Sequence, residues 1–71
     1  MDLSVAEKIR VVLRRKGMTL GDLAEALGSS RQNLSNKMSR DNFSAAEIRA
    51  IAAALECEAE IIFRMPDGSA I

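Results

Sequence analysis

Three capping boxes set the starts of helices in the first 47 residues of the chain. In each box a serine or threonine precedes a carboxylate by three positions: Ser4 with Glu7, Thr19 with Asp22, and Ser44 with Glu47. The hydroxyl can accept a hydrogen bond from the amide of the acidic residue, while the carboxylate reaches back to the first amide. This spacing of helix starts limits the chain to short helices that follow one another closely.

Apolar residues recur at helical spacing after each box, and glycine ends the first two segments at Gly17 and Gly28. A further helix follows Gly28, capped by Ser30, or by Ser29 together with Gln32. The sequence therefore predicts a mostly all-α fold with four helices, at residues 5–16, 20–27, 31–38 and 45–55.

The last part of the chain has a different character. Residues 59–65, AEIIFRM, are rich enough in β-branched and aromatic side chains to predict a strand. Proline, aspartate and glycine at 66–68 predict a turn, and a return of residues 69–71 as a second strand stays open. We expect a helical domain at residues 1–57 and a short C-terminal β-strand or hairpin at 58–71.

Composition argues against several classes of function. With 71 residues, no histidine and one cysteine, the chain suits a single domain without an internal disulfide or a zinc site. It has no glycine-rich phosphate loop and no nucleophile with a matching base, so we expect no enzyme activity, no metal and no cofactor. We interpret the glutamates at 56, 58 and 60 as a solvated edge rather than a metal site, and Cys57 as a small buried hydrophobe rather than a reactive thiol.

The sequence gives no membrane signal. No apolar run approaches the length of a transmembrane helix, and the first residues, MDLSVAEK, lack the basic and apolar regions of a signal peptide. We therefore expect a cytoplasmic protein, in which a lone thiol stays reduced.

Charge is unevenly distributed although the net charge is zero. Residues 1–40 hold eight basic and four acidic side chains, whereas residues 41–71 hold two basic and six acidic ones. The first part could face a polyanion, but an ordinary solvated surface would carry the same charges. For Arg14, Arg15 and Lys16, at the end of the first helix, a favourable interaction with the helix dipole is preferred over a phosphate contact.

The segment 28–38, GSSRQNLSNKM, concentrates side chains with hydrogen-bonding heads. Its link of two residues, Gly28 and Ser29, forces the flanking helices to cross steeply, as in a helix-turn-helix. Only Leu34 and Met38 are apolar, so the rest of this helix is expected to point outward. A merely solvated face is the alternative, but it would favour Glu, Lys and Ala over Asn and Ser, which are mediocre helix formers.

The outward side chains match the edges of DNA bases. Arginine pairs with guanine, and glutamine or asparagine pairs with adenine through two hydrogen bonds. Placed in a major groove, this helix would present five base-contacting residues: Arg31, Gln32, Asn33, Ser35 and Asn36. Ser30 and the free amides at the helix start would meet a phosphate.

The segment MTLGDLAEALGSSRQNLSNKM resembles the helix-turn-helix of the Cro/CI-type phage repressor family, also called XRE-like. The resemblance extends over about residues 4–57, and its matching residues are Thr19, Leu23, Ala24, Leu27, Gly28, Ser30 and Leu34. It implies a lambda-repressor-like bundle that binds double-stranded DNA, usually as a dimer. It places the base contacts on the same five residues, and the predicted phosphate contacts are Thr19, Ser30, Lys37, Arg40 and Asn42.

Three positions depart from the family pattern. Leu20 stands where the family often has a glutamine that touches a phosphate, and Ser29 stands where the turn commonly carries an apolar residue. Glu56 stands where the fourth helix usually ends in glycine, so the end of that helix is the least defined by resemblance.

The predicted strand leaves unpaired backbone groups that need a partner. We expect a homodimer in which Ile61, Ile62 and Phe63 lie at the interface; a monomer whose hairpin folds onto its own core is the alternative. A two-fold dimer would place two recognition helices about 34 Å apart on an inverted repeat.

We therefore expect a small sequence-specific regulator of transcription, a repressor from a bacterium or a mobile element. One alternative is an antitoxin that binds a partner toxin through the acidic C-terminal part. Another is a protein-interaction scaffold, which the neutral net charge would suit.

Overall fold

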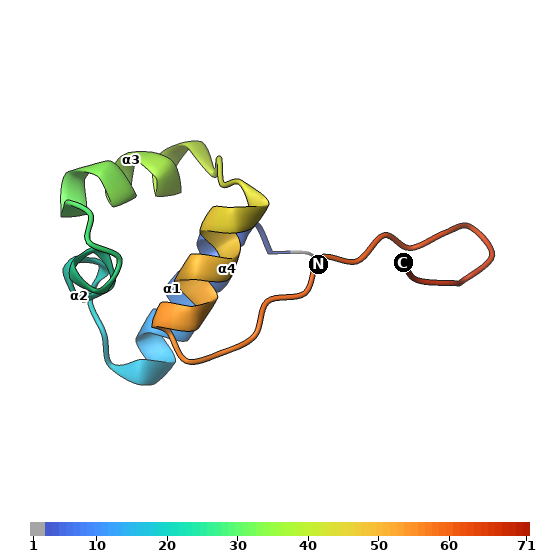
Figure 1. Ribbon diagram of the computed structural model, residues 1–71, viewed down its shortest axis with the longest axis horizontal. Coiled ribbons are helices and arrows are strands. Elements are labelled where there is room, and N and C mark those ends of the chain that lie inside the picture. Colours follow the sequence, from blue (N-terminus) through green and yellow to red (C-terminus); the bar gives the residue numbers. More distant parts are fainter. Residues whose placement is uncertain (1–2) are drawn as a thin grey trace.

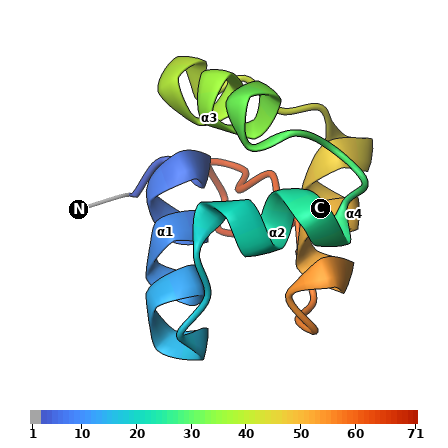
Figure 2. The same ribbon diagram turned by 90° about the vertical axis from the view of Figure 1, so that its left-hand side faces the viewer.

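The computed structural model describes residues 3–71 and contains four α-helices within them: α1 Val5–Lys16, α2 Leu20–Ala26, α3 Arg31–Arg40 and α4 Ala45–Ala54. Helices α1 and α4 stand on either side of the bundle, α2 crosses between them, and α3 lies across one end (Figures 1 and 2). The predicted four-helix fold is confirmed. Among these described helices, none is long and apolar enough to cross a membrane.

All three capping boxes predicted from the sequence form. Each hydroxyl accepts a hydrogen bond from the amide three residues on at 3.1 Å, and each carboxylate accepts from the first amide at 2.8–2.9 Å. Helix α3 has a single cap, in which the hydroxyl of Ser30 accepts from the amide of Asn33 at 3.1 Å. Because these caps are local in sequence, all four helices begin at the predicted residue.

The helix ends agree less well. Helix α1 ends at Lys16, with Gly17 as its cap, as predicted, while α2 and α4 each end one residue before the predicted end. The prediction that α3 stops at residue 38 was wrong, because Asp41 takes a left-handed conformation with φ 51° and ends the helix there. Its carboxylate Oδ1 accepts from the amide of Ala6 at 2.8 Å, which ties the end of α3 to the start of α1. Arg40 thus lies in the last turn of α3 and not in a loop.

The hydrophobic core draws side chains from all four helices. Leu23 of α2 is completely buried, and Leu34 and Met38 are the buried residues of α3. The remaining buried apolar residues come from α1, α2, α4 and the residue after it: Ala6, Ile9, Leu13, Ala24, Ile51, Ala52 and Leu55. Helix α3 is therefore held to the bundle through one narrow apolar stripe.

We call residues 58–71 the arm, because they run away from the bundle on the side opposite α2 and α3 (Figure 1). The predicted strand over residues 59–65 was wrong in extent: in the arm as described, the β-pairing is a single antiparallel bridge between Arg64 and Ala70. Phe63 and Ile71 exchange two backbone hydrogen bonds of 2.8 and 2.9 Å, so residues 69–71 do return. A strand needs a partner along its length, and this short return supplies one only near its end.

The arm does not cover the core, so the alternative of a hairpin folded onto its own bundle is not observed. The exposed fractions of its large apolar side chains run from 44% to 79%: Ile61, Ile62, Phe63, Met65 and Ile71. The expectation that Cys57 is buried was also wrong, because the chain has already left the bundle at this residue and the thiol is exposed.

Glu56 occupies the position where the family pattern has glycine, and its backbone explains the preference. It adopts φ 56°, and the amide of the next residue, Cys57, donates to the carbonyl of Ala52 at 2.9 Å to close the helix end. A Cβ atom strains a left-handed residue, which glycine adopts without that cost.

We expect Glu56→Gly to raise the free energy of unfolding by about 1 kcal/mol, since it relieves this strain. Urea unfolding followed by circular dichroism measures the change. The matched control is Glu56→Ala, which removes the same charge but keeps Cβ and should give no comparable gain. An equal gain from both variants would show that charge, not backbone strain, governs this position.

Candidate nucleic-acid interface

Helix α3 crosses α2 steeply, as the short link between them predicted. Figure 1 looks down the axis of α2, while α3 lies in the plane of the picture above it. Gly28 takes φ 68°, and the amide of Ser29 donates to the carbonyl of Ala24 at 2.9 Å, so the chain changes direction sharply between the two helices. The two helices form the helix-turn-helix arrangement expected from the sequence.

The outer face of α3 lies opposite its buried stripe. At 3.6 residues per turn, Gln32 and Asn36 fall on the side away from Leu34 and Met38, and both amide side chains are exposed. The Nε2 atom of Gln32 donates to Oδ1 of Asn36 at 3.2 Å. This pair links two of the predicted base-contacting residues and leaves the carbonyl oxygen of Gln32 outside the bond.

Three other predicted base-contacting residues flank this pair. Asn33 is exposed, whereas Ser35 is half-buried, which makes it the least accessible of the five. A side-chain carbon placed on Gly21 would lie 3.7 Å from Cδ of Arg31 and 3.6 Å from Oγ1 of Thr19. The side chains of Arg31, at the start of α3, and of Thr19, at the start of α2, thus both lie close to Gly21.

Sequence reasoning missed one exposed residue on the outer face. Ser39 lies three positions after Asn36 and seven after Gln32, so it shares their side of α3. The spacing alone would have placed Ser39 on this face, but the helix was expected to end at residue 38, before Ser39.

The hydroxyls of Thr19 and Ser30 accept hydrogen bonds from backbone amides in their caps. A hydroxyl that accepts in this way keeps its own hydrogen to donate to a phosphate. Arg40 and Asn42, at the end of α3 and just after it, are both exposed. These four predicted phosphate-contacting residues can therefore donate hydrogen bonds to the phosphates of a DNA backbone.

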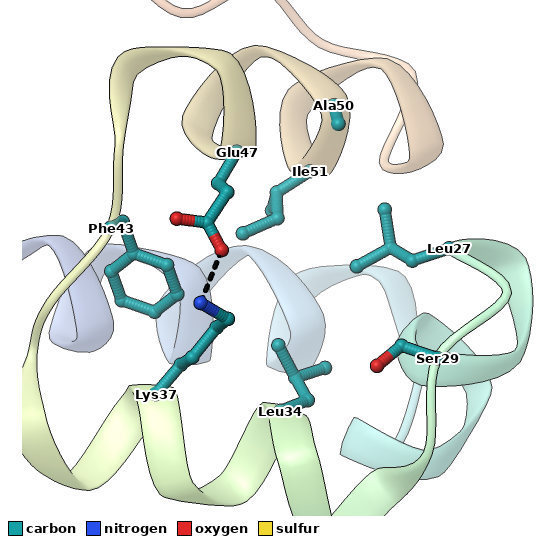
Figure 3. Close-up of a pocket in the computed structure, with 8 residues that line it drawn as sticks. All are labelled: Leu27, Ser29, Leu34, Lys37, Phe43, Glu47, Ala50 and Ile51. Atoms are coloured by element: carbon teal, nitrogen blue, oxygen red, sulfur yellow. Dashed lines mark ion pairs between the residues drawn. The ribbon is translucent and has the colours of Figure 1, made fainter.

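Lys37 differs from the other predicted phosphate contacts because it already has a partner. Its ammonium forms an ion pair with the carboxylate of Glu47 at the start of α4 (Figure 3). The pair sits at the rim of a hollow of about 210 Å³ that α3, α4 and the link after α2 enclose, with Leu27, Leu34 and Ile51 in its wall. Helix α3 is thus tied to α4 by charge as well as by packing, and Lys37 points toward the bundle.

The hydrogen bond from Lys37, together with the bonds from Ser44, lowers the pKa of Glu47 from 4.5 to about 2. The pKa of Glu7 is also lowered, by its capping bonds from Ser4. A carboxylate whose pKa is lower in the folded state stabilises the fold above its unfolded pKa. This stabilisation is lost as the pH falls from about 4.5 toward 2.

We expect the thermal midpoint of the protein to fall between pH 5 and pH 3, and to fall less in Glu47→Gln. Glutamine still serves the capping box with Ser44 but carries no charge to lose. Scans at both pH values by circular dichroism measure the difference. Glu25→Gln, on the exposed surface of α2, is the control. If the thermal midpoint depended on pH equally weakly in both variants, the role of the ion pair between Lys37 and Glu47 would be contradicted.

The basic residues at the end of α1 lie far from α3. Helix α1 runs from the end of the bundle that carries α3 to the opposite end, where Arg14, Arg15 and Lys16 form its last turn (Figure 2). This position in the last turn favours their interaction with the helix dipole.

Comparison with known protein families supports the resemblance drawn from the sequence. The family model of the Cro/C1-type HTH DNA-binding domain matches residues 8–67, from the first turn of α1 into the turn of the arm. Comparisons with curated proteins and with solved structures give no significant match. Because the family match spans most of the chain, the protein belongs to the Cro/C1-type helix-turn-helix DNA-binding domain family.

Proposed function

We propose that the protein is a sequence-specific, dimeric repressor of transcription that reads double-stranded DNA with α3 in the major groove. The observation that carries the proposal is the outer face of α3, where amide side chains stand exposed opposite a buried apolar stripe. Helix α3 holds three basic residues and no acidic one, so the approach to a polyanion is favourable.

The proposed contacts divide into two groups. Base edges are read by Arg31, Gln32, Asn33, Ser35 and Asn36, with Ser39 added as a sixth candidate on the same face. Phosphates are held by Thr19, Ser30, Arg40 and Asn42, while Lys37, also predicted from the sequence, stays in its ion pair with Glu47. The position of Arg31 and Thr19 beside the same residue, Gly21, supports a second role for Arg31, in which its guanidinium also reaches the phosphate at the start of α2.

The proposed dimer forms through the arm. Ile61, Ile62 and Phe63 are exposed, and the arm leaves the bundle on the side away from α2 and α3. Pairing there would leave both copies of α3 free to enter successive major grooves of an inverted repeat, about 34 Å apart. This geometry supports a two-fold symmetric operator.

The proposal is tested by selecting bound sequences from a pool of random duplexes and titrating the selected duplex by fluorescence anisotropy at two salt concentrations. We expect an inverted repeat, tight binding at low salt, and a steep loss of affinity as salt rises. Recovery of no preferred sequence, with equal affinity for the selected and a scrambled duplex, would contradict sequence-specific reading.

We expect Glu47→Gln to release Lys37 and thereby strengthen binding to any duplex. One more phosphate contact per subunit should steepen the dependence of log affinity on log salt by about 0.9 per contact. The same titration measures the slope, and the double variant Glu47→Gln, Lys37→Gln is the control. A steeper slope in that double variant would show that the gain does not come from Lys37.

A second candidate function is supported by the same arm. Its exposed apolar side chains follow acidic residues at 56, 58 and 60, which suits a basic partner such as a toxin bound by an antitoxin. Copurification of a stoichiometric basic protein from the source cell, together with a monomeric state of the purified chain, would favour this reading.

A further inference from the structure

The arm pairs its backbone over only part of its length. Residues 63–71 form a hairpin held by one antiparallel bridge and a few backbone hydrogen bonds, and such a hairpin alone is marginal in water. Five large apolar side chains of the arm remain exposed next to unpaired backbone groups: Ile61, Ile62, Phe63, Met65 and Ile71. An exposed apolar edge of this kind calls for a further strand.

The hydrogen bonds inside the hairpin determine which edge is free. Phe63 and Ile71 exchange two backbone bonds, and the amide of Met65 donates to the carbonyl of Ser69 at 2.8 Å. In an antiparallel ladder, backbone groups of alternate residues point to opposite edges. Since the backbone groups of Phe63 and Met65 point to the other half of the hairpin, those of Ile62 and Arg64 point to its outer edge.

Building on the proposed dimer, we propose that two copies pair antiparallel along this outward edge with Ile62 on the two-fold axis. This register sets Glu60 opposite Arg64 of the second copy, and Arg64 opposite Glu60 of the second copy. It also sets Ile61 opposite Phe63 of the second copy, and the reverse. Over residues 60–64, each charged side chain therefore faces an opposite charge of the second copy, and each apolar side chain faces an apolar one. This pattern stabilises an antiparallel pair.

A shift of the axis to Phe63 breaks these matches. It places Glu60 opposite Pro66, which has no backbone amide to donate, and it places Arg64 opposite Ile62. The charged groups of both copies then lack opposite partners in the ladder.

A shift of the axis to Ile61 keeps one kind of charge pair. Arg64 then faces Glu58, but Glu60 faces the apolar Ile62 of the second copy. The two registers differ in which glutamate meets the arginine, and this difference makes the register measurable.

The experiment uses two charge reversals in the full chain, Glu60→Arg and Arg64→Glu. In the proposed register each variant alone places two like-charged pairs in its homodimer, and we expect dimerisation about tenfold weaker at low salt. A one-to-one mixture restores both attractive pairs in the heterodimer, so its dimerisation should return to the wild-type level. Sedimentation equilibrium of each variant and of the mixture measures both effects, and circular dichroism confirms that each variant is folded.

Glu58→Arg is the matched control. In the proposed register Glu58 faces Pro66 of the second copy, so this reversal should weaken the dimer far less than Glu60→Arg. The register would be overturned if mixing the two variants did not restore dimerisation, or if Glu58→Arg weakened the dimer as much as Glu60→Arg. In either case a dimeric wild type would leave the proposed function standing. A wild-type chain that stays monomeric at every concentration would overturn both the dimer and its register, whereas the DNA titrations test recognition by α3 independently.

Discussion

Replacing Leu34 with alanine is expected to lower the free energy of unfolding by about 2–5 kcal/mol. Leu34 is 3% exposed and, with Met38, supplies the entire buried stripe of α3. Its side chain also forms part of the wall of the hollow beside α4, together with Leu27 and Ile51 (Figure 3). Truncation would enlarge this hollow rather than let it collapse, because α2 and α4 fix its other walls.

Such a loss is large for a chain of this length. A domain of 71 residues has a total stability on the order of 4–11 kcal/mol, so Leu34→Ala should leave a substantial unfolded fraction at physiological temperature. The chain has no tryptophan or tyrosine, so urea unfolding is best followed by far-ultraviolet circular dichroism. All samples need one protein concentration, since a dimer couples stability to concentration.

The controls separate packing from chemistry. Leu34→Met keeps the volume and should cost less than about 1.5 kcal/mol, as should Met38→Leu. If Leu34→Ala lowered the free energy of unfolding no more than Leu34→Met does, helix α3 would be held by something other than its apolar stripe. The ion pair of Lys37 with Glu47 would then be the first interaction to examine.

The starts of the helices were predictable because their causes are local. A hydroxyl at the cap and a carboxylate three residues on decide the first turn without reference to the rest of the chain. The end of α3 depends on contacts between distant segments. Asp41 ends the helix in a left-handed conformation and bonds to Ala6, thirty-five residues away, and nothing in the local sequence indicates that bond.

The arm shows the limit of propensity. Residues 59–65 have the composition of a strand, but a strand exists only where another segment pairs with it. Within the described chain, the backbone bonds to the segment after Pro66 reach back only as far as Phe63. The same absence of packing partners explains why Cys57 is exposed rather than buried.

The candidate site was predictable in its residue types and less so in its arrangement. The crowding of amides and hydroxyls in residues 28–38 indicated α3 as the candidate recognition element. The pairing of Lys37 with Glu47 and the position of Arg31 beside Gly21 depend on how the helices pack, and the bond between Gln32 and Asn36 depends on the rotamers of two side chains. These contacts distinguish the surroundings of the candidate residues from one another.

Gln32→Ala is expected to cause the largest loss of sequence discrimination among the variants of α3. Gln32 lies on the outer face, where its bond to Asn36 orders the side chain before the protein binds DNA. A glutamine that makes two hydrogen bonds to adenine discriminates by about 1–3 kcal/mol, and a two-fold operator loses this contact twice. Affinity for the selected operator should therefore fall by about 30-fold or more, while affinity for a scrambled duplex stays unchanged.

Arg40→Ala provides the contrast, because a phosphate contact should weaken all duplexes alike and reduce the salt slope by about 1 per contact. Asn36→Ala tests the ordering of Gln32. If Asn36 positions Gln32, the double variant should lose less than the sum of the two single losses, since each single change already disturbs the pair. An equal loss on operator and scrambled duplex for Gln32→Ala would remove this residue from base reading and leave it a phosphate or structural role.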